Sequence, residues 1–102
     1  MSENNNKIII FVISDSAGET ASKLAQATMA QYPTVDFELY RRTFIQDATS
    51  LNQALHDAKG LDAMVIYTII NPDLVQLTQE FCKANNLYSM NVLSPPVEEV
   101  AK

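Results

Sequence analysis

The chain has 102 residues, 47% hydrophobic and 19% charged, which is enough to bury one core and too few for two domains. Two glycines, four prolines and the lack of low-complexity tracts exclude collagen-like and disordered classes, and a single cysteine excludes an internal disulfide. The net charge of -5 disfavours nucleic acid and anionic membranes as partners. The longest apolar run, Ile8 to Ile13, is far short of the ~20 residues that span a bilayer, and a basic signal-peptide region is lacking. We therefore expect a soluble, cytoplasmic protein.

A strand and a helix open the chain. The run from Ile8 to Ile13 is β-branched or aromatic throughout, which predicts a strand buried on both faces, as in a parallel sheet. Residues at helical spacing then form a stripe that stops before Pro33. The stripe consists of Ala21, Leu24, Ala25, Thr28, Met29 and Tyr32. Because Ser16 and Glu19 have the spacing of a capping box, we expect them to close the amino end of this helix.

A second strand and a second helix follow. Val35–Tyr40 alternates apolar with polar residues until its end, which predicts a shorter strand nearer a sheet edge. A helix is predicted from about Asp47 or Ser50 to Lys59, with Gly60 as its left-handed cap. The residues expected to face inward on this helix are Leu51, Ala54, Leu55 and Ala58.

The pattern then repeats in the last third of the chain. Ala63–Ile70 predicts a third strand, and Asn71-Pro72 has the residue types that open a helix, with Asn as the N-cap. The residues expected to face inward on this helix, which would end at Asn85-Asn86, are Leu74, Leu77, Phe81 and Ala84. Tyr88–Leu93 predicts a weaker fourth strand, and Val97–Lys102 the first turns of another helix.

Strands and helices alternate with short connections and without hairpin turn signals. This predicts an α/β fold with three layers: an open, parallel, four-stranded sheet with helices on both faces, Rossmann-like, in strand order 2-1-3-4. We expect residues 1–102 to form a single domain that is the N-terminal fragment of a longer protein. In such sheets ligands bind beyond the carboxyl ends of the strands, where the strand order reverses. We therefore expect a ligand site in the loops that follow the strands.

The loop from Ser14 to Thr20 is the most informative of these. Its hydroxyls and the free amides at the start of the helix suit an oxyanion, and Arg41 and Arg42 would add positive charge. The residues expected to bind a phosphate or similar small anion are Ser14, Asp15, Ser16, Ala17, Gly18, Thr20, Arg41, Arg42, Thr68 and Asn71. In the alternative interpretation, Ser16 and Glu19 only cap the helix, the arginines form a solvated strand end, and the carboxylates of this loop repel phosphate.

Other chemistries lack the residues that they require. The third strand ends at Thr68, where a receiver domain needs a phospho-acceptor Asp, and the loop after the first strand has no Cys for a phosphatase-type nucleophile. We expect Cys82 to be a buried thiol and His56 to face solvent. With one His and no Cys pair, no metal site is expected.

The segment from Phe11 to Ala21, FVISDSAGETA, resembles the N-terminal part of the bacterial kinase/pyrophosphorylase family, the regulators of pyruvate, phosphate dikinase and phosphoenolpyruvate synthase. The resemblance extends over nearly the whole chain. The further matching segments are Tyr32-Pro33, Val35-Asp36-Phe37, Arg41 with Phe44, Val65-Ile66-Tyr67-Thr68 and Glu80-Phe81-Cys82. Ala17 stands where the family favours Thr.

The resemblance implies a bifunctional serine/threonine kinase and phosphorylase. Such a parent protein uses ADP to phosphorylate, and phosphate to dephosphorylate, a Thr of one of these two target enzymes. Its nucleotide-binding (ATP-binding) P-loop, G-x-x-x-x-G-K-[ST], would lie in a later domain, and that string does not occur here. No catalytic residue is therefore assigned to this chain, which by itself is expected to be inactive. Two alternatives remain: a non-catalytic recognition or oligomerisation module, with a homodimer as one form, and a small-anion-binding Rossmann-like domain.

Overall fold

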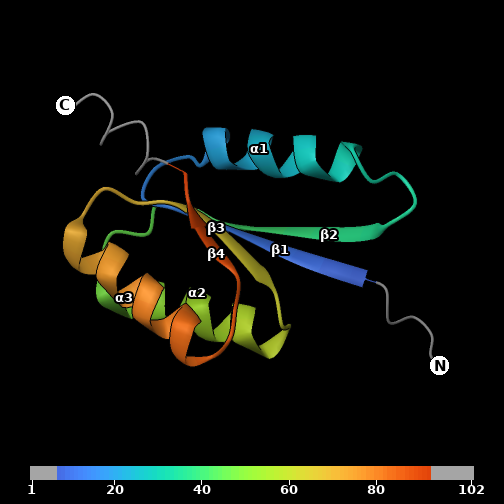
Figure 1. Cartoon of the computed structure of the whole chain (residues 1–102). Helices are drawn as coiled ribbons and strands as arrows, with labels where there is room; N and C mark the ends of the chain where they lie inside the picture. The colour runs from blue at the N-terminus through green and yellow to red at the C-terminus, as the bar shows by residue number, and fades with distance from the viewer. Residues whose placement is uncertain (1–6, 93–102) are drawn as a thin grey trace, which may run out of the picture.

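Strands and helices alternate along the chain in the order that the sequence predicts. The structure is a computed structural model that describes residues 7–92 (Figure 1). Its elements are β1 (Lys7–Ser14), α1 (Glu19–Ala30), β2 (Asp36–Arg42), α2 (Ala48–Gly60), β3 (Met64–Thr68), α3 (Pro72–Ala84) and β4 (Ser89–Asn91). The predicted strand at Tyr88–Leu93 is thus shorter in the structure, and the predicted helix at Val97–Lys102 lies outside the described residues.

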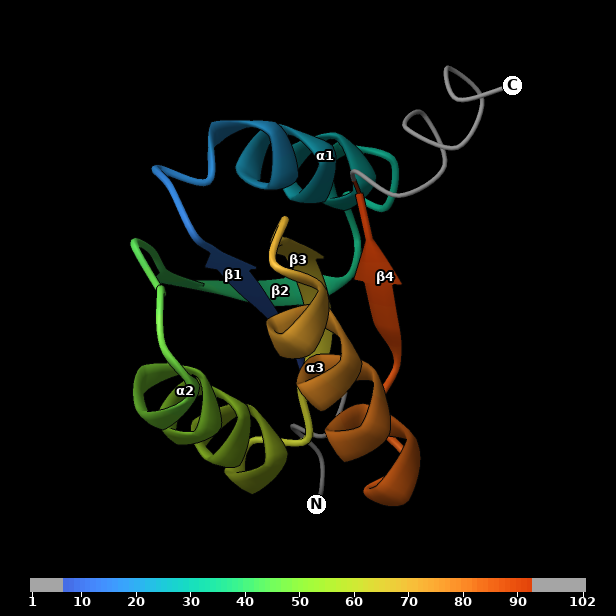
Figure 2. The ribbon, with the colours of Figure 1, turned by 90° about the vertical axis from the view of Figure 1, so that its left-hand side faces the viewer.

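The strands form one sheet in the order β2-β1-β3-β4, and every neighbouring pair is parallel. Helix α1 covers one face, and α2 and α3 cover the other, so the molecule has three layers (Figures 1 and 2). This confirms the predicted Rossmann-like α/β fold and its strand order. β2 and β4 are the edge strands, which explains why β2 alternates in polarity whereas β1 is apolar from Ile8 to Ile13.

Strand β1 supplies both halves of the core. Phe11 and Ile13 pack on the side of α2 and α3, whereas Ile10 and Val12 pack on the side of α1, and all four side chains have 0% exposure. The inward residues predicted for α2, Leu51, Ala54, Leu55 and Ala58, are all buried as well. The continuous apolar run in the sequence therefore indicates a central strand that is buried on both faces.

The helix ends agree with the sequence patterns at two positions and differ at two others. Asp47 caps α2 by accepting a hydrogen bond from the Ser50 amide at 2.7 Å, and Asn71 caps α3 through the amides of Asp73 and Leu74. The capping box predicted at Ser16 and Glu19 is wrong, because α1 begins after Gly18 and no side chain caps it.

Gly60 is also not a left-handed cap. It is the last helical residue of α2, and the chain enters the left-handed region two residues later, at Asp62 (φ 54°). Asp and Asn tolerate this conformation better than most residues with a side chain, and so the turn needs no glycine.

Three further predictions need correction. Of the residues predicted to face inward on α3, Leu74 is buried and Leu77 and Phe81 pack partly buried against the core, but Ala84 is exposed. Thr78 and Cys82 complete the buried side of this helix. Tyr32 lies beyond the end of α1 and is 53% exposed. Arg41 and Arg42 belong to β2 rather than to the loop after it. In the described part of the chain, no helix is long and apolar enough to cross a membrane.

The central role of α2 in the larger core gives a stability prediction. Leu55→Ala removes a side chain with 0% exposure and should lower the free energy of unfolding by about 2–5 kcal/mol. Leu61→Ala is the matched control because Leu61 is 41% exposed, and it should change stability by less than about 0.5 kcal/mol. Urea denaturation of both variants measures the difference, and equal effects would contradict the core described here.

The cap of α2 gives a pH prediction. Hydrogen bonds from Ser50, above all from its amide, lower the pKa of Asp47 below its ordinary value near 3.8. A carboxyl with a depressed folded-state pKa stabilises the fold above its unfolded pKa, and that stabilisation is lost as the pH falls through the folded value. The stability difference between the natural chain and Asp47→Ala should therefore shrink below about pH 4. A difference that stays constant between pH 7 and pH 3 would contradict it.

Candidate functional site

The carboxyl ends of β1 and β3 meet at the point where the connections diverge to opposite faces of the sheet. Ser14 and Thr68, the last residues of these strands, are register partners. After Ser14 the chain enters α1 on one face, and after Thr68 it enters α3 on the other (Figure 2). A crevice opens between two neighbouring parallel strands whose connections leave toward opposite faces of the sheet, and ligands bind in such crevices.

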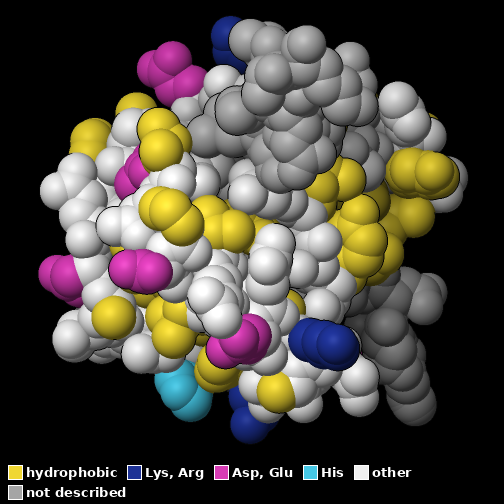
Figure 3. Space-filling view, turned by 60° about the vertical axis from the view of Figure 1, so that its left-hand side comes forward, with side chains coloured by type: hydrophobic (Ala, Val, Ile, Leu, Met, Phe, Trp, Pro, Cys, Tyr) yellow, Lys and Arg dark blue, Asp and Glu magenta, His cyan; other side chains and the backbone are white. Residues whose placement is uncertain are grey.

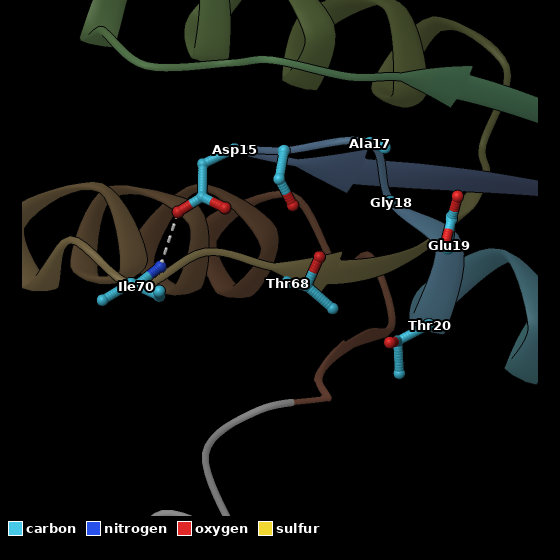
Figure 4. Close-up of a pocket in the computed structure, with 8 residues that line it drawn as sticks. Asp15, Ala17, Gly18, Glu19, Thr20, Thr68 and Ile70 are labelled. Carbon is cyan, nitrogen blue, oxygen red and sulfur yellow. Dashed lines mark hydrogen bonds between the residues drawn. The ribbon is translucent and has the colours of Figure 1, made fainter.

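A cavity of about 350 Å³ lies in this crevice. Its lining residues are Asp15, Ser16, Ala17, Gly18, Glu19, Thr20, Thr68 and Ile70 (Figure 4). The volume is at the low end of the ~300–1,000 Å³ range of small-molecule sites. The structure therefore brings together the predicted loop from Asp15 to Thr20 and the predicted Thr68.

Three hydroxyl groups form a hydrogen-bonded chain beside this cavity. Thr68 Oγ1 donates to Ser14 Oγ at 2.8 Å, and the Ser16 amide donates to the same oxygen at 3.1 Å. Ser16 Oγ lies 3.3 Å from Ser14 Oγ. Ser14 is completely buried, so it lies beneath the loop and holds the two lining hydroxyls in place.

Gly18 sets the direction in which α1 starts. Its φ of +75° is in the left-handed region, and a Cβ there would lie 3.2 Å from Ser14 Cβ and 3.4 Å from Thr43 Cγ2. The first helical hydrogen bond runs from the Ser22 amide to the Gly18 carbonyl. The preceding amides of Glu19, Thr20 and Ala21 consequently have no partner within the helix, and they carry its positive dipole end.

The two arginines lie on opposite faces of the sheet. Arg41 pairs in register with Val12, on the α1 side, and its Nη2 donates to the Ala17 carbonyl at 3.1 Å. Arg42 lies over the Phe11 ring at 5.1 Å and contacts Asp57 of α2 at 3.4 Å. Only Arg41 therefore places its charge beside the predicted anion loop.

Asp15 connects this loop to the segment after β3. Its Oδ2 accepts from the Ile70 amide at 3.0 Å, and its own amide donates to the Thr68 carbonyl at 3.3 Å (Figure 4). Asn71 lies on the other side of this bridge, where it caps α3 and lines a second cavity of about 340 Å³. The remaining residues of that second cavity are Asp15, Ile45, Gln46, Ile70 and Leu74.

Two exposed residues beside the site were not among the predicted site residues. Ile70 is 76% exposed and borders both cavities, and Phe44 is 67% exposed with a left-handed φ of 57°. The Phe44 amide donates to the Ser16 carbonyl at 3.0 Å, which attaches the end of β2 to the loop after β1. The signal for Phe44 was its place beside Arg41 in the family resemblance, whereas Ile70 was predicted as the end of the third strand.

The remaining titratable candidates are not arranged as catalytic groups. Cys82 is buried, and burial raises the pKa of its thiol. His56 is exposed and lies edge-on to Phe81. Among residues 7–92, no group of three His, Cys, Asp or Glu side chains could hold a metal ion. The polar chemistry at this edge therefore consists of amides, hydroxyls, two carboxylates and the Arg41 guanidinium.

Comparison with known proteins gives a consistent result. The sequence model of the kinase/pyrophosphorylase family matches residues 10–102. A pyruvate, phosphate dikinase regulatory protein of Enterococcus faecalis is 59% identical over 93 residues, covering 91% of this chain and 34% of the relative. Proteins named in the same way from Pediococcus pentosaceus and Levilactobacillus brevis are 37% and 39% identical, covering 100% and 90% of this chain and 38% and 34% of the relatives. The chain thus spans about a third of the length of these relatives.

The two glycines provide a matched test of the loop geometry. Gly18→Ala forces a side chain into the left-handed region against Ser14, and should lower the free energy of unfolding by about 1–2 kcal/mol or more. Gly60→Ala places its methyl group where no atom lies within 4 Å, in a helical residue, and should raise stability by about 0.4–1 kcal/mol. Urea denaturation should give opposite signs for the two variants, and equal signs would contradict the loop conformation.

Proposed function

Because the chain belongs to the kinase/pyrophosphorylase family, we propose that it is part of a regulatory enzyme that acts on pyruvate, phosphate dikinase or phosphoenolpyruvate synthase. In the first reaction the β-phosphoryl group of ADP passes to a Thr hydroxyl of the target, and AMP leaves. In the second, inorganic phosphate attacks the phosphothreonine, and pyrophosphate leaves as the Thr hydroxyl is restored. The names of the relatives support the first target, and both reactions require a site for a phosphate group.

We assign a phosphate-binding role to the cavity between β1 and β3. The observation that carries this assignment is the start of α1, whose first two residues line the cavity and whose first three amides have neither a helical partner nor a side-chain cap. Helices α2 and α3 are instead capped by Asp47 and Asn71. Arg41, held against the Ala17 carbonyl, adds a positive charge on the same side of the sheet.

The transfer chemistry itself needs more than this chain contains. Phosphoryl transfer depends on positioning and on charge neutralisation by P-loop amides, a Lys and a metal ion. The P-loop string does not occur in the sequence, and Asp15 and Glu19 offset the charge of Arg41. In this proposal the cavity holds a phosphate group, and the nucleotide binds to a part of the parent protein outside this chain.

A recognition or oligomerisation module is the alternative from a different class. Such a module needs exposed apolar side chains grouped on one surface, typically on one helix face. In the described part of the chain, the exposed large apolar residues all lie outside the helices: Ile8, Tyr32, Phe44, Leu61, Ile70, Tyr88 and Met90. Figure 3 shows acidic and hydrophobic side chains interspersed on the left of the view and a group of hydrophobic side chains on the right. The helix faces of the described residues thus lack large exposed apolar side chains, which favours the phosphate site.

Amide NMR spectroscopy tests phosphate binding directly. Titration with millimolar inorganic phosphate at constant ionic strength should shift the amide signals of Ala17, Gly18 and Glu19. Arg41→Gln should weaken binding by up to about fivefold, whereas Arg42→Gln, on the other face, should leave it unchanged. The absence of shifts in this loop would remove the proposed site.

The division of labour within the parent protein is tested by activity. The purified 102-residue chain, incubated with the phosphohistidine form of the dikinase and ADP, should produce no phosphothreonine. The control is a full-length regulatory protein under the same conditions. Comparable turnover by the two proteins would show that the active site lies within this chain.

A further inference from the structure

The cavity contains hydrogen-bond acceptors as well as donors, and both acceptors are fixed by the structure. Asp15 accepts the Ile70 amide with Oδ2, and its other oxygen keeps its full capacity to accept. Thr68 is only 6% exposed, and its hydroxyl lines the cavity at the end of β3 (Figure 4). A site for an ordinary anion would carry donors at these two positions.

The direction of the hydroxyl chain makes Thr68 an acceptor toward the cavity. Thr68 gives its only proton to Ser14 Oγ, and Ser14 Oγ also accepts the Ser16 amide, so both of its lone pairs are occupied. The proton of Ser14 is then left for Ser16 Oγ, 3.3 Å away. Ser16, which is exposed on the cavity lining, keeps its own proton to donate to a ligand.

This arrangement separates anions by whether they carry a proton. Inorganic phosphate retains at least one proton at neutral pH, and sulfate, with nearly the same shape, retains none. A phosphothreonine side chain is also largely deprotonated, since its second pKa is about 6. An anion without a proton leaves its lone pairs against the lone pairs of Asp15 and Thr68, which costs affinity.

The geometry points to protonated inorganic phosphate as the ligand of this cavity, with Asp15 or Thr68 accepting its O–H. The amides at the start of α1 and the Ser16 hydroxyl would donate to its other oxygens. The inference rests on the proposed function and refines it: the cavity would hold the phosphate that attacks the phosphothreonine, rather than the phosphothreonine itself. It also explains why a carboxylate, that of Asp15, lines a site that binds an anion.

Competing anions test this inference. The chain is titrated at pH 7.5 and constant ionic strength with phosphate, with sulfate and with an N-acetylated, C-amidated phosphothreonine, and the α1 amides are followed by NMR. Phosphate should bind at least about tenfold more tightly than either of the others. If none of the three shifts these amides, the proposed phosphate site fails. If sulfate or the phosphothreonine binds as tightly as phosphate, only the inference fails.

Variants identify the acceptors. In Asp15→Asn the side-chain oxygen can still accept the Ile70 amide while an N–H₂ replaces the free oxygen, so sulfate should bind about as tightly as phosphate. Thr68→Val keeps the shape but removes the second acceptor, so it should lower phosphate affinity and narrow the preference for phosphate over sulfate. Asp36→Asn, the same charge change at the amino end of β2, should leave the preference for phosphate intact. A preference for phosphate that survives in both Asp15→Asn and Thr68→Val would overturn the assignment.

Discussion

Complete burial of one strand governs this structure. β1 has a neighbour on each edge and helices on both faces, and from Ile10 to Ser14 it has no accessible surface. The chain leaves the buried part of β1 at its carboxyl end, at Ser14. Because Ser14 is itself buried, its polar groups must find partners inside the protein. Thr68 and Ser16 supply them. The polar crevice beside β3 is therefore a direct result of the way in which the apolar core is closed.

Periodicity alone carried most of the fold prediction. Apolar runs and helical stripes place all seven described elements, and the inward residues of α2 were identified individually because they follow the helical period without exception. The errors fall at helix ends. Ser16 and Glu19 have the residue types and spacing of a capping box, but Ser16 contacts Ser14, two residues earlier, and not the start of α1. Ser14 is in turn bound by Thr68, 54 residues later in the chain, and local sequence cannot show that contact.

The site was predictable to the level of loops and not of side chains. The rule for parallel sheets selected the loop from Asp15 to Thr20 and also Thr68, and these residues do line one cavity. Asn71 was grouped with them, but it faces the neighbouring cavity, and Ile70 was missed. The Asp15–Ile70 bridge that divides the two cavities depends on the separation of β1 and β3 loops in space, which no spacing within either loop encodes.

The alternation of side chains along β2 has a consequence for how this chain tolerates insertions and deletions. Arg41 and Arg42 are chemically alike, yet one lies beside the Ala17 carbonyl and the other over Phe11, because successive strand residues face opposite ways. Deleting one residue within β2 would exchange their faces, and both contacts would be lost together. The turn between α1 and β2, residues 31–35, is exposed over most of its length and is free of that restriction. Insertions and deletions among related chains should therefore occur in this turn rather than in β2, the seven residues that follow it.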